Sequence, residues 1–299
     1  MNSRAFGIFA VIFVQVLYGL NYTFAKNVMN ESFVKPFGFV VLRVIGAASL
    51  FWLLGLFQKT EKIEKKDFLT IIAAAFFGVG LNMLFFLKGL EYTTPIHASV
   101  ITTITPIVIL VFSAIFLSEK LTKLKIIGVF FGFCGGVLLT TLGESNRVGD
   151  NVALGNTFIF LNAISYSIYV ILVKKLTAKY HPFTFIKWLF LFGIIFVLPF
   201  GYTQATEIEW ASFPAYIWFS VAFVVVGATF GTYFFNPISL RLLKASTVGV
   251  SIYLQPVFAG IFAILMGADS ISVVKVMAMC LIFFGVFLVT KPPKVAENT

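Results

Sequence analysis

Charged residues are scarce in this chain. Asp, Glu, Lys and Arg make up 11% of its 299 residues, whereas about a quarter of the residues of a soluble protein are charged. Hydrophobic residues make up 60%, and the 38 phenylalanines are too many to leave on a surface that faces water. The composition therefore excludes an ordinary soluble domain and predicts an all-α integral membrane protein.

The chain also lacks the residue clusters on which enzymes and metal sites depend. Its two histidines, His97 and His181, are far apart in the sequence, and its two cysteines, Cys134 and Cys280, lie in apolar runs. We find no metal-ligand spacing, phosphate-binding loop or nucleotide motif. We therefore expect no enzyme, no catalytic residue, no metal and no cofactor.

No Asp or Glu lies near the middle of an apolar run. The first carboxylate of the chain is Glu31, which follows the first run. Acidic residues inside a membrane commonly mark sites that bind cations or relay protons. We therefore expect neither a cation exporter with a buried carboxylate nor proton coupling through such a group.

Ten apolar runs are long enough to cross a bilayer as helices. They span residues 6–27, 36–57, 68–89, 95–117, 124–142, 154–174, 183–203, 213–236, 245–267 and 272–290. The connections are short and leave no room for a folded domain outside the membrane. The first run has no clear cleavage site, so we expect it to remain as a helix.

The second half of the sequence resembles the first at an offset of about 150 residues. Segment 89–140 aligns with 239–290 without a gap. The aligned positions include Pro106 with Pro256, Glu119 with Asp269 and Gly135 with Gly285. A duplication of this kind predicts two domains of five helices each, residues 1–143 and 144–299.

Five helices per half is an odd number, so the second half enters the membrane from the opposite side. Run 95–117 and its counterpart 245–267 then cross in opposite directions. The predicted fold is therefore ten transmembrane helices arranged as two inverted five-helix repeats.

Lys and Arg residues are spread unevenly over the connections. If the N-terminus is inside, most of them lie in inner connections. Those left for the outer side are Lys26, Lys35, Lys88, Arg147 and Lys275. Because cytoplasmic loops carry the excess of Lys and Arg, we expect a multi-pass protein of a bacterial-type inner membrane with both termini cytoplasmic. The net charge of +10 then reflects topology and not nucleic-acid binding.

The stretch 90–140 carries a distinctive pattern. Pro106 lies in the middle of its apolar run, and Glu119 ends that run before a short polar turn. The run that follows contains Gly128, Gly132, Gly135 and Gly136. Upstream, Arg43 follows Pro36 in the second run.

These features resemble the EamA family of the drug/metabolite transporter (DMT) superfamily. The resemblance covers essentially the whole chain, although Tyr18 stands where the family usually has Trp and Asp269 replaces Glu in the second copy. It implies transport of small metabolites, amino acids among them, often outwards. It also implies a central cavity lined by helices 1, 3, 4, 6, 8 and 9.

Polar side chains near the middle of the membrane are costly, and, apart from Arg43 in the second run, the candidates fall on those six runs. The candidate substrate-binding residues are Tyr18, Asn21, Tyr22, Arg43, Asn82, Thr102, Tyr166, Tyr169, Tyr233, Tyr253 and Gln255. Tyr18, Asn21 and Tyr22 share one helix face by their spacing. A hydrogen bond between helices is the alternative role for each candidate. Arg43 has three roles open to it: snorkelling to the interface, pairing with Glu91, or meeting a substrate carboxylate.

We predict a transporter that moves a small neutral, zwitterionic or anionic metabolite by alternating access, with amino acid export favoured. One alternative is a sugar-nucleotide or phosphate-ester exchanger, which usually needs more cavity Lys or Arg than Arg43 alone. Another is a membrane scaffold or sensor without transport. The expected partners are the small-molecule substrate and the lipid bilayer, and not nucleic acid. Ten helices suffice for a complete monomer, and a homodimer stays open.

Overall fold

The computed structural model describes residues 3–30, 33–58, 61–92, 101–141, 151–265 and 272–291. All the regular secondary structure in these ranges is helical. In chain order, the elements are α1 (Ser3–Asn30), α2 (Pro36–Gly55), α3 (Lys65–Ala75), η1 (Phe76–Leu81), α4 (Asn82–Tyr92), α6 (Thr105–Leu117), α7 (Lys123–Thr141), α8 (Val152–Thr177), α9 (Pro182–Thr206), η2 (Trp210–Ser212), α10 (Ala215–Ala222), η3 (Phe223–Gly231), α11 (Thr232–Leu242), α12 (Ala245–Val250), η4 (Ser251–Tyr253), α13 (Leu254–Leu265) and α14 (Val273–Thr290).

Eight stretches of helix in the described ranges are long and apolar enough to cross a membrane. The two other expected spans correspond to α6 and α7. Of these, α6 is a shorter apolar helix, and the start of its expected span at residue 95 lies outside the described residues. Large apolar side chains such as Phe130, Leu265 and Val273 are more than half exposed, which suits a surface that faces lipid.

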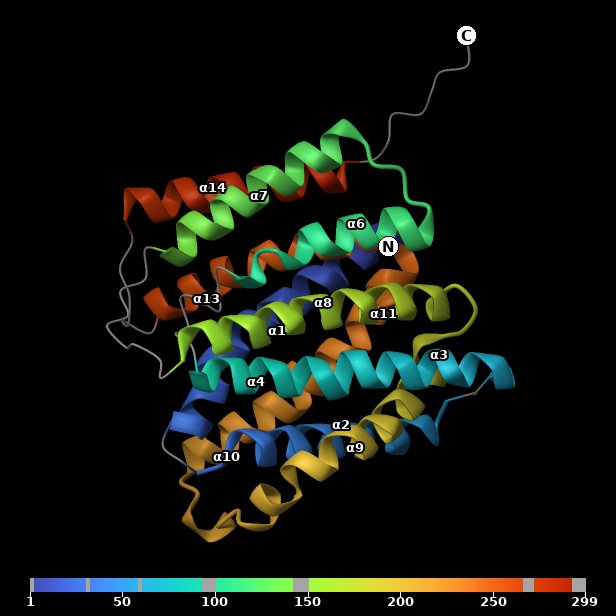
Figure 1. The fold of residues 1–299 in the computed structure, drawn as a ribbon, viewed down its shortest axis with the longest axis vertical. Coiled ribbons are helices and arrows are strands. Elements are labelled where there is room, and N and C mark those ends of the chain that lie inside the picture. Colours follow the sequence, from blue (N-terminus) through green and yellow to red (C-terminus); the bar gives the residue numbers. More distant parts are fainter. Residues whose placement is uncertain are drawn as a thin grey trace.

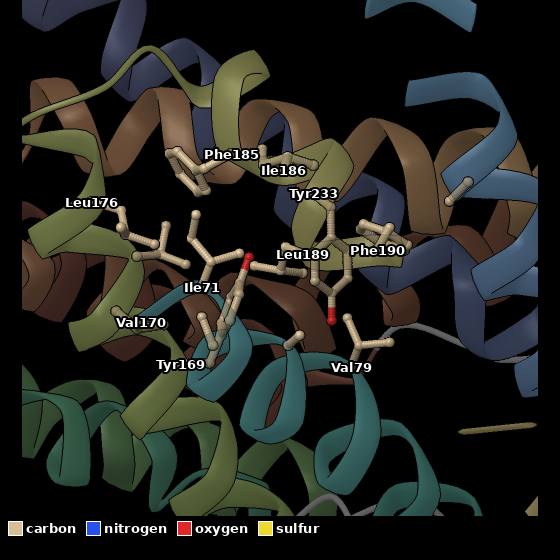
Figure 2. Packing of buried hydrophobic residues seen from close by; sticks show 14 of the residues in the cluster. Ile71, Val79, Tyr169, Val170, Leu176, Phe185, Ile186, Leu189, Phe190 and Tyr233 are labelled. Atoms are coloured by element: carbon tan, nitrogen blue, oxygen red, sulfur yellow. The ribbon is translucent and has the colours of Figure 1, made fainter. Parts of the chain in front are cut away.

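The helices lie side by side in one bundle, with α7 beside α14 at one edge and α2 beside α9 at the other (Figure 1). The largest buried cluster lies where α2, α3, α8, α9 and α11 meet. In Figure 2 the side chains of Ile71, Tyr169 and Leu189 point toward one another. The rings of Phe190 and Tyr233 pack edge to face, with centroids 4.9 Å apart. This cluster therefore joins helices from the two halves of the sequence.

Glycine allows α7 and α14 to pack backbone against backbone. A Cβ atom added to Gly285 would lie 2.5 Å from the carbonyl oxygen of Gly128, and one added to Gly135 would lie 2.8 Å from that of Ala278. No side chain fits into such a crossing. The early part of α7 meets the late part of α14 and the reverse, so the two helices are antiparallel.

The pair α2 and α9 is also antiparallel. At one end, the Gln204 side chain accepts hydrogen bonds from the backbone N–H groups of Phe37 (2.8 Å) and Gly38 (3.1 Å). These N–H groups belong to the first turn of α2 and have no partner within the helix. At the other end, the rings of Trp52 and Trp188 lie 5.2 Å apart.

We expect Gly285→Ala to destabilise the protein, because its new methyl group would clash with the α7 backbone. Overpacking of this kind costs about 1–3 kcal/mol. The matched control is Gly260→Ala in α13, because a Cβ atom there would meet nothing within 4 Å. Thermal unfolding of the purified protein in detergent should show a lower Tm for Gly285→Ala and no loss for the control. Equal Tm values for the two variants would contradict the close crossing.

Candidate functional site

In the described ranges, two membrane helices contain a π-helical segment, η1 between α3 and α4 and η3 between α10 and α11. A π-helical turn shifts the hydrogen-bond register, so some carbonyl groups need other partners. In η1, the Ser165 hydroxyl donates to the carbonyl of Phe77 at 2.7 Å, and the Tyr233 hydroxyl donates to that of Gly78 at 2.6 Å. Side chains from α8 and α11 therefore fix η1 in place.

The second π-helical segment holds a buried cation. The Thr229 hydroxyl donates to the carbonyl of Val224 at 2.7 Å within η3. The Nε atom of Arg43, from α2, donates in turn to Thr229 Oγ1 at 2.9 Å. Arg43 is only 7% exposed. The local geometry of η3 therefore positions the guanidinium group.

A polar pocket of about 120 Å³ lies at the centre of the bundle, next to these groups. Its lining residues are Tyr18, Asn21, Arg43, Asn82, Met83, Phe86, Thr102, Thr105, Asn162, Tyr166, Tyr233, Ile252 and Gln255. They come from α1, α2, α4, α6 with the residues before it, α8, α11, η4 and α13. The pocket therefore collects polar side chains from both halves of the sequence.

Hydrogen bonds hold much of the pocket wall. Asn162 Nδ2 donates to the carbonyl of Asn82 at 2.7 Å, and Gln255 Nε2 donates to Gln15 Oε1 at 2.8 Å. Asn21 differs, because its Oδ1 atom is buried and has no hydrogen-bond partner among the described residues. A buried acceptor without a donor is costly, so this atom is suited to a ligand that brings an N–H or O–H group.

Most of the candidate residues predicted from the sequence line this pocket. They are Tyr18, Asn21, Arg43, Asn82, Thr102, Tyr166, Tyr233 and Gln255. The side chain of Tyr22 lies outside the described residues. Tyr169 and Tyr253 do not line the pocket and are each only 1% exposed. Their rings pack instead over Gly78 and Gly132 of neighbouring helices.

Five further residues line the pocket. Thr105 and Asn162 are polar groups near mid-membrane, and Met83, Phe86 and Ile252 are apolar. Phe86 follows Asn82 by four residues, so helical spacing was a usable signal for it. The sequence carried no comparable signal for Ile252, which lies in the short 3₁₀ segment η4.

The end of the bundle near Glu119 is closed by contacts between the two halves. The Glu119 carboxylate accepts hydrogen bonds from the backbone N–H of Ala245 (2.7 Å), the hydroxyl of Ser246 (2.6 Å) and Nζ of Lys125 (3.0 Å). Burial alone would raise the pKa of Glu119, but these hydrogen bonds hold it below its ordinary value. The charged form of Glu119 therefore binds the first turn of α12.

Lysine side chains add contacts at the same end. Lys174 Nζ donates to the carbonyl of Leu243 at 2.8 Å, just after α11, and Lys179 pairs with Asp67 at 2.9 Å. The pocket lies away from this end, because its residues Thr102 and Thr105 precede or begin α6 while Glu119 follows the end of that helix. The closed end thus lies on one side of the pocket.

Comparison with known proteins agrees with the resemblance seen in the sequence. A model of the EamA-like transporter family matches residues 5–141 and 153–291. An uncharacterized transporter of Archaeoglobus fulgidus is 27% identical over 278 residues, which cover 92% of this chain and 95% of that protein. The uncharacterized transporter YetK of Bacillus subtilis is 24% identical over 227 residues, which cover 76% and 69% of the two chains.

A solved structure described as "Crystal structure of protein" shares the fold. The TM-score is 0.76 at 17% identity, and the match covers 96% of this chain and 95% of that one. At this identity the likeness shows the fold alone.

We expect Glu119→Gln to lower the stability at neutral pH by about 3 kcal/mol, because it leaves the buried ammonium of Lys125 unpaired. A depressed carboxyl pKa stabilises the fold above the unfolded-state pKa, and this stability is lost as the pH falls through the folded-state pKa. The Tm of the unaltered protein should therefore fall more steeply below about pH 4.3 than that of the variant.

Glu207→Gln is the matched control, because it breaks the exposed ion pair with Lys35. Such a pair contributes about 0–1 kcal/mol. If Glu119→Gln at pH 7 were as stable as this control, the Glu119 contacts would not hold the closed end.

Proposed function

Because the chain belongs to the EamA-like transporter family, we propose that it carries a small neutral, zwitterionic or anionic metabolite across the membrane by alternating access. The observation that supports this most directly is the central pocket, where polar groups of both sequence halves surround the buried cation Arg43. Relatives described as transporters agree with a role other than catalysis.

We infer that residues 1–143 and 144–299 are two inverted repeats of five helices. Three observations support this. The family model matches the chain twice. The helix pairs α7 with α14 and α2 with α9, which are equivalent under the repeat, run antiparallel to each other. The segments η1 and η3 also recur at nearly the spacing of the sequence repeat. Rocking of two such halves about a shared site gives alternating access.

The proposed orientation places the Glu119 end in the cytoplasm of a bacterial-type cell, because the basic residues concentrate there. Arg4 donates a hydrogen bond to the carbonyl of Thr290, so the start of α1 and the end of α14 lie at the same end of the bundle. Both termini would then be cytoplasmic. With this orientation, the conformation described here is closed toward the cytoplasm.

The size of the pocket favours a small metabolite. A volume of about 120 Å³ holds several waters and is smaller than the roughly 300–1,000 Å³ of pockets for drug-sized ligands. An amino acid fits this size and offers a charge for Arg43 and a donor for Asn21 Oδ1. We therefore favour an amino acid as the substrate. Export is the direction that the family resemblance implies.

The two alternatives have less support. A sugar-nucleotide or phosphate-ester exchanger would have to neutralise a multiply charged ligand, and Arg43 is the one Lys or Arg that lines the described pocket. A scaffold or sensor without transport has no need for a buried acceptor such as Asn21 Oδ1 that lacks a donor.

We expect at least one proteinogenic amino acid to raise the Tm of the purified protein, because a ligand present at 100 times its Kd stabilises by about 2.7 kcal/mol. Asn21→Ala should lose most of this shift. Ser113→Ala is the matched control, since among the described residues that buried hydroxyl bonds to the carbonyl of Leu110 in its own helix. A full amino acid panel without any shift, or an equal shift in Asn21→Ala, would contradict the proposed site.

We expect amino acid exchange in proteoliposomes to continue after a protonophore has removed the pH gradient. The reason is that no carboxylate lines the described pocket to take up a coupled proton. The measurement is exchange of a radiolabelled amino acid, with and without an imposed gradient. Uptake that depends strictly on the gradient would contradict this expectation.

A further inference from the structure

Arg43 is a buried cation that lacks a counterion in the described part of the protein. It is 7% exposed, and its hydrogen bond goes to a neutral hydroxyl, that of Thr229. Ion pairs among the described residues include those of Lys35, Lys66, Lys125 and Lys179. An isolated charge is expensive inside a membrane unless another group pairs with it.

Glu91 was the sequence-based candidate for a partner of Arg43. Its side chain lies outside the described residues. Its position on α4 is more than two turns beyond Asn82, which lines the pocket together with Arg43. This separation is about 13 Å along the helix axis at 1.5 Å per residue. The residues of α4 that line the pocket with Arg43 are Asn82, Met83 and Phe86, and the last of these precedes Glu91 by five residues, or about 7.5 Å.

The guanidinium is held so that one edge remains for a ligand. Thr229 occupies Nε, and the bond from Thr229 to the carbonyl of Val224 fixes the orientation of that hydroxyl. The two terminal nitrogens form the edge that binds a carboxylate through two parallel hydrogen bonds. Because Arg43 lines the pocket, a solute in the pocket has access to it.

Building on the proposed transport function, we propose that Arg43 binds a carboxylate of the substrate. The transported class then consists of small monocarboxylates, zwitterionic amino acids included, and neutral solutes are excluded. The substrate supplies the negative charge that Arg43 lacks. Asn21, which lines the same pocket, has a buried acceptor without a donor among the described residues, and this acceptor suits the ammonium or hydroxyl group of such a molecule.

The test uses matched pairs of solutes that differ only by a carboxylate or a carboxamide. Suitable pairs are L-alanine with L-alaninamide, L-phenylalanine with L-phenylalaninamide, and lactate with lactamide. Binding to the purified full-length protein is measured by thermal shift and by calorimetry. Because a hydrogen bond to a charged group is worth more than a neutral one, the carboxylate of a pair should bind about tenfold to a hundredfold more tightly than its amide.

Three variants assign this preference to Arg43. Arg43→Gln removes the charge and should abolish the preference. Arg43→Lys keeps a charge without the planar fork and should retain a weaker preference. Lys88→Gln is the matched control, because it removes a cation that lies outside the central pocket, against the rings of Phe37 and Tyr92. It should bind like the unaltered protein. The preference of the unaltered protein remains decisive if Arg43→Gln does not fold.

The outcomes separate this inference from the proposed function. If amides bind as tightly as their carboxylates, or if Arg43→Gln keeps the preference, the role of Arg43 is wrong while transport of a metabolite stands. If none of the carboxylates binds, both this inference and the amino acid assignment fail. Preference for carboxylates in the unaltered protein and in Lys88→Gln, with its loss in Arg43→Gln, supports the inference.

Discussion

Inside a bilayer no water is available to the protein backbone, so every carbonyl group that leaves the regular helical pattern needs a partner within the protein. The segments η1 and η3 break that pattern near the centre of the bundle. Their carbonyls are bound by Ser165, Tyr233 and Thr229, and Thr229 also holds Arg43. The requirement to satisfy the backbone thus places hydroxyl groups and a cation around the pocket.

Features that depend on regular spacing could be read from the sequence. The apolar runs predicted most of the membrane helices to within a few residues, because bilayer thickness sets the length of a run. The run that became α7 stands out by its glycines, and two of them, Gly128 and Gly135, lie where α14 crosses it. Polar residues in otherwise apolar runs, such as Asn21 and Asn82, indicated the pocket because it is costly to bury a polar group inside a membrane.

Features that depend on a partner from another helix could not be read in this way. Tyr169 and Tyr253 carry a polar group within an apolar run, as the pocket residues do. Each ring nevertheless fills the space that a glycine leaves on a neighbouring helix. The π-helical turns have no simple residue signature. The bond from Glu119 to the first turn of α12 joins residues more than 120 positions apart, and one sequence does not reveal such a pairing.

The glycine crossing of α7 with α14 has a mechanical consequence. Contacts between long side chains can rearrange when the side chains change rotamer, whereas two backbones in direct contact have no such freedom. The α7–α14 pair is therefore stiff for sliding and twisting. A second contact of this kind joins α1 to α13, because a Cβ atom added to Gly19 would lie 3.0 Å from the carbonyl oxygen of Gln255. Stiff glycine contacts therefore lie both at the α7–α14 edge and between α1 and α13, two helices that line the pocket.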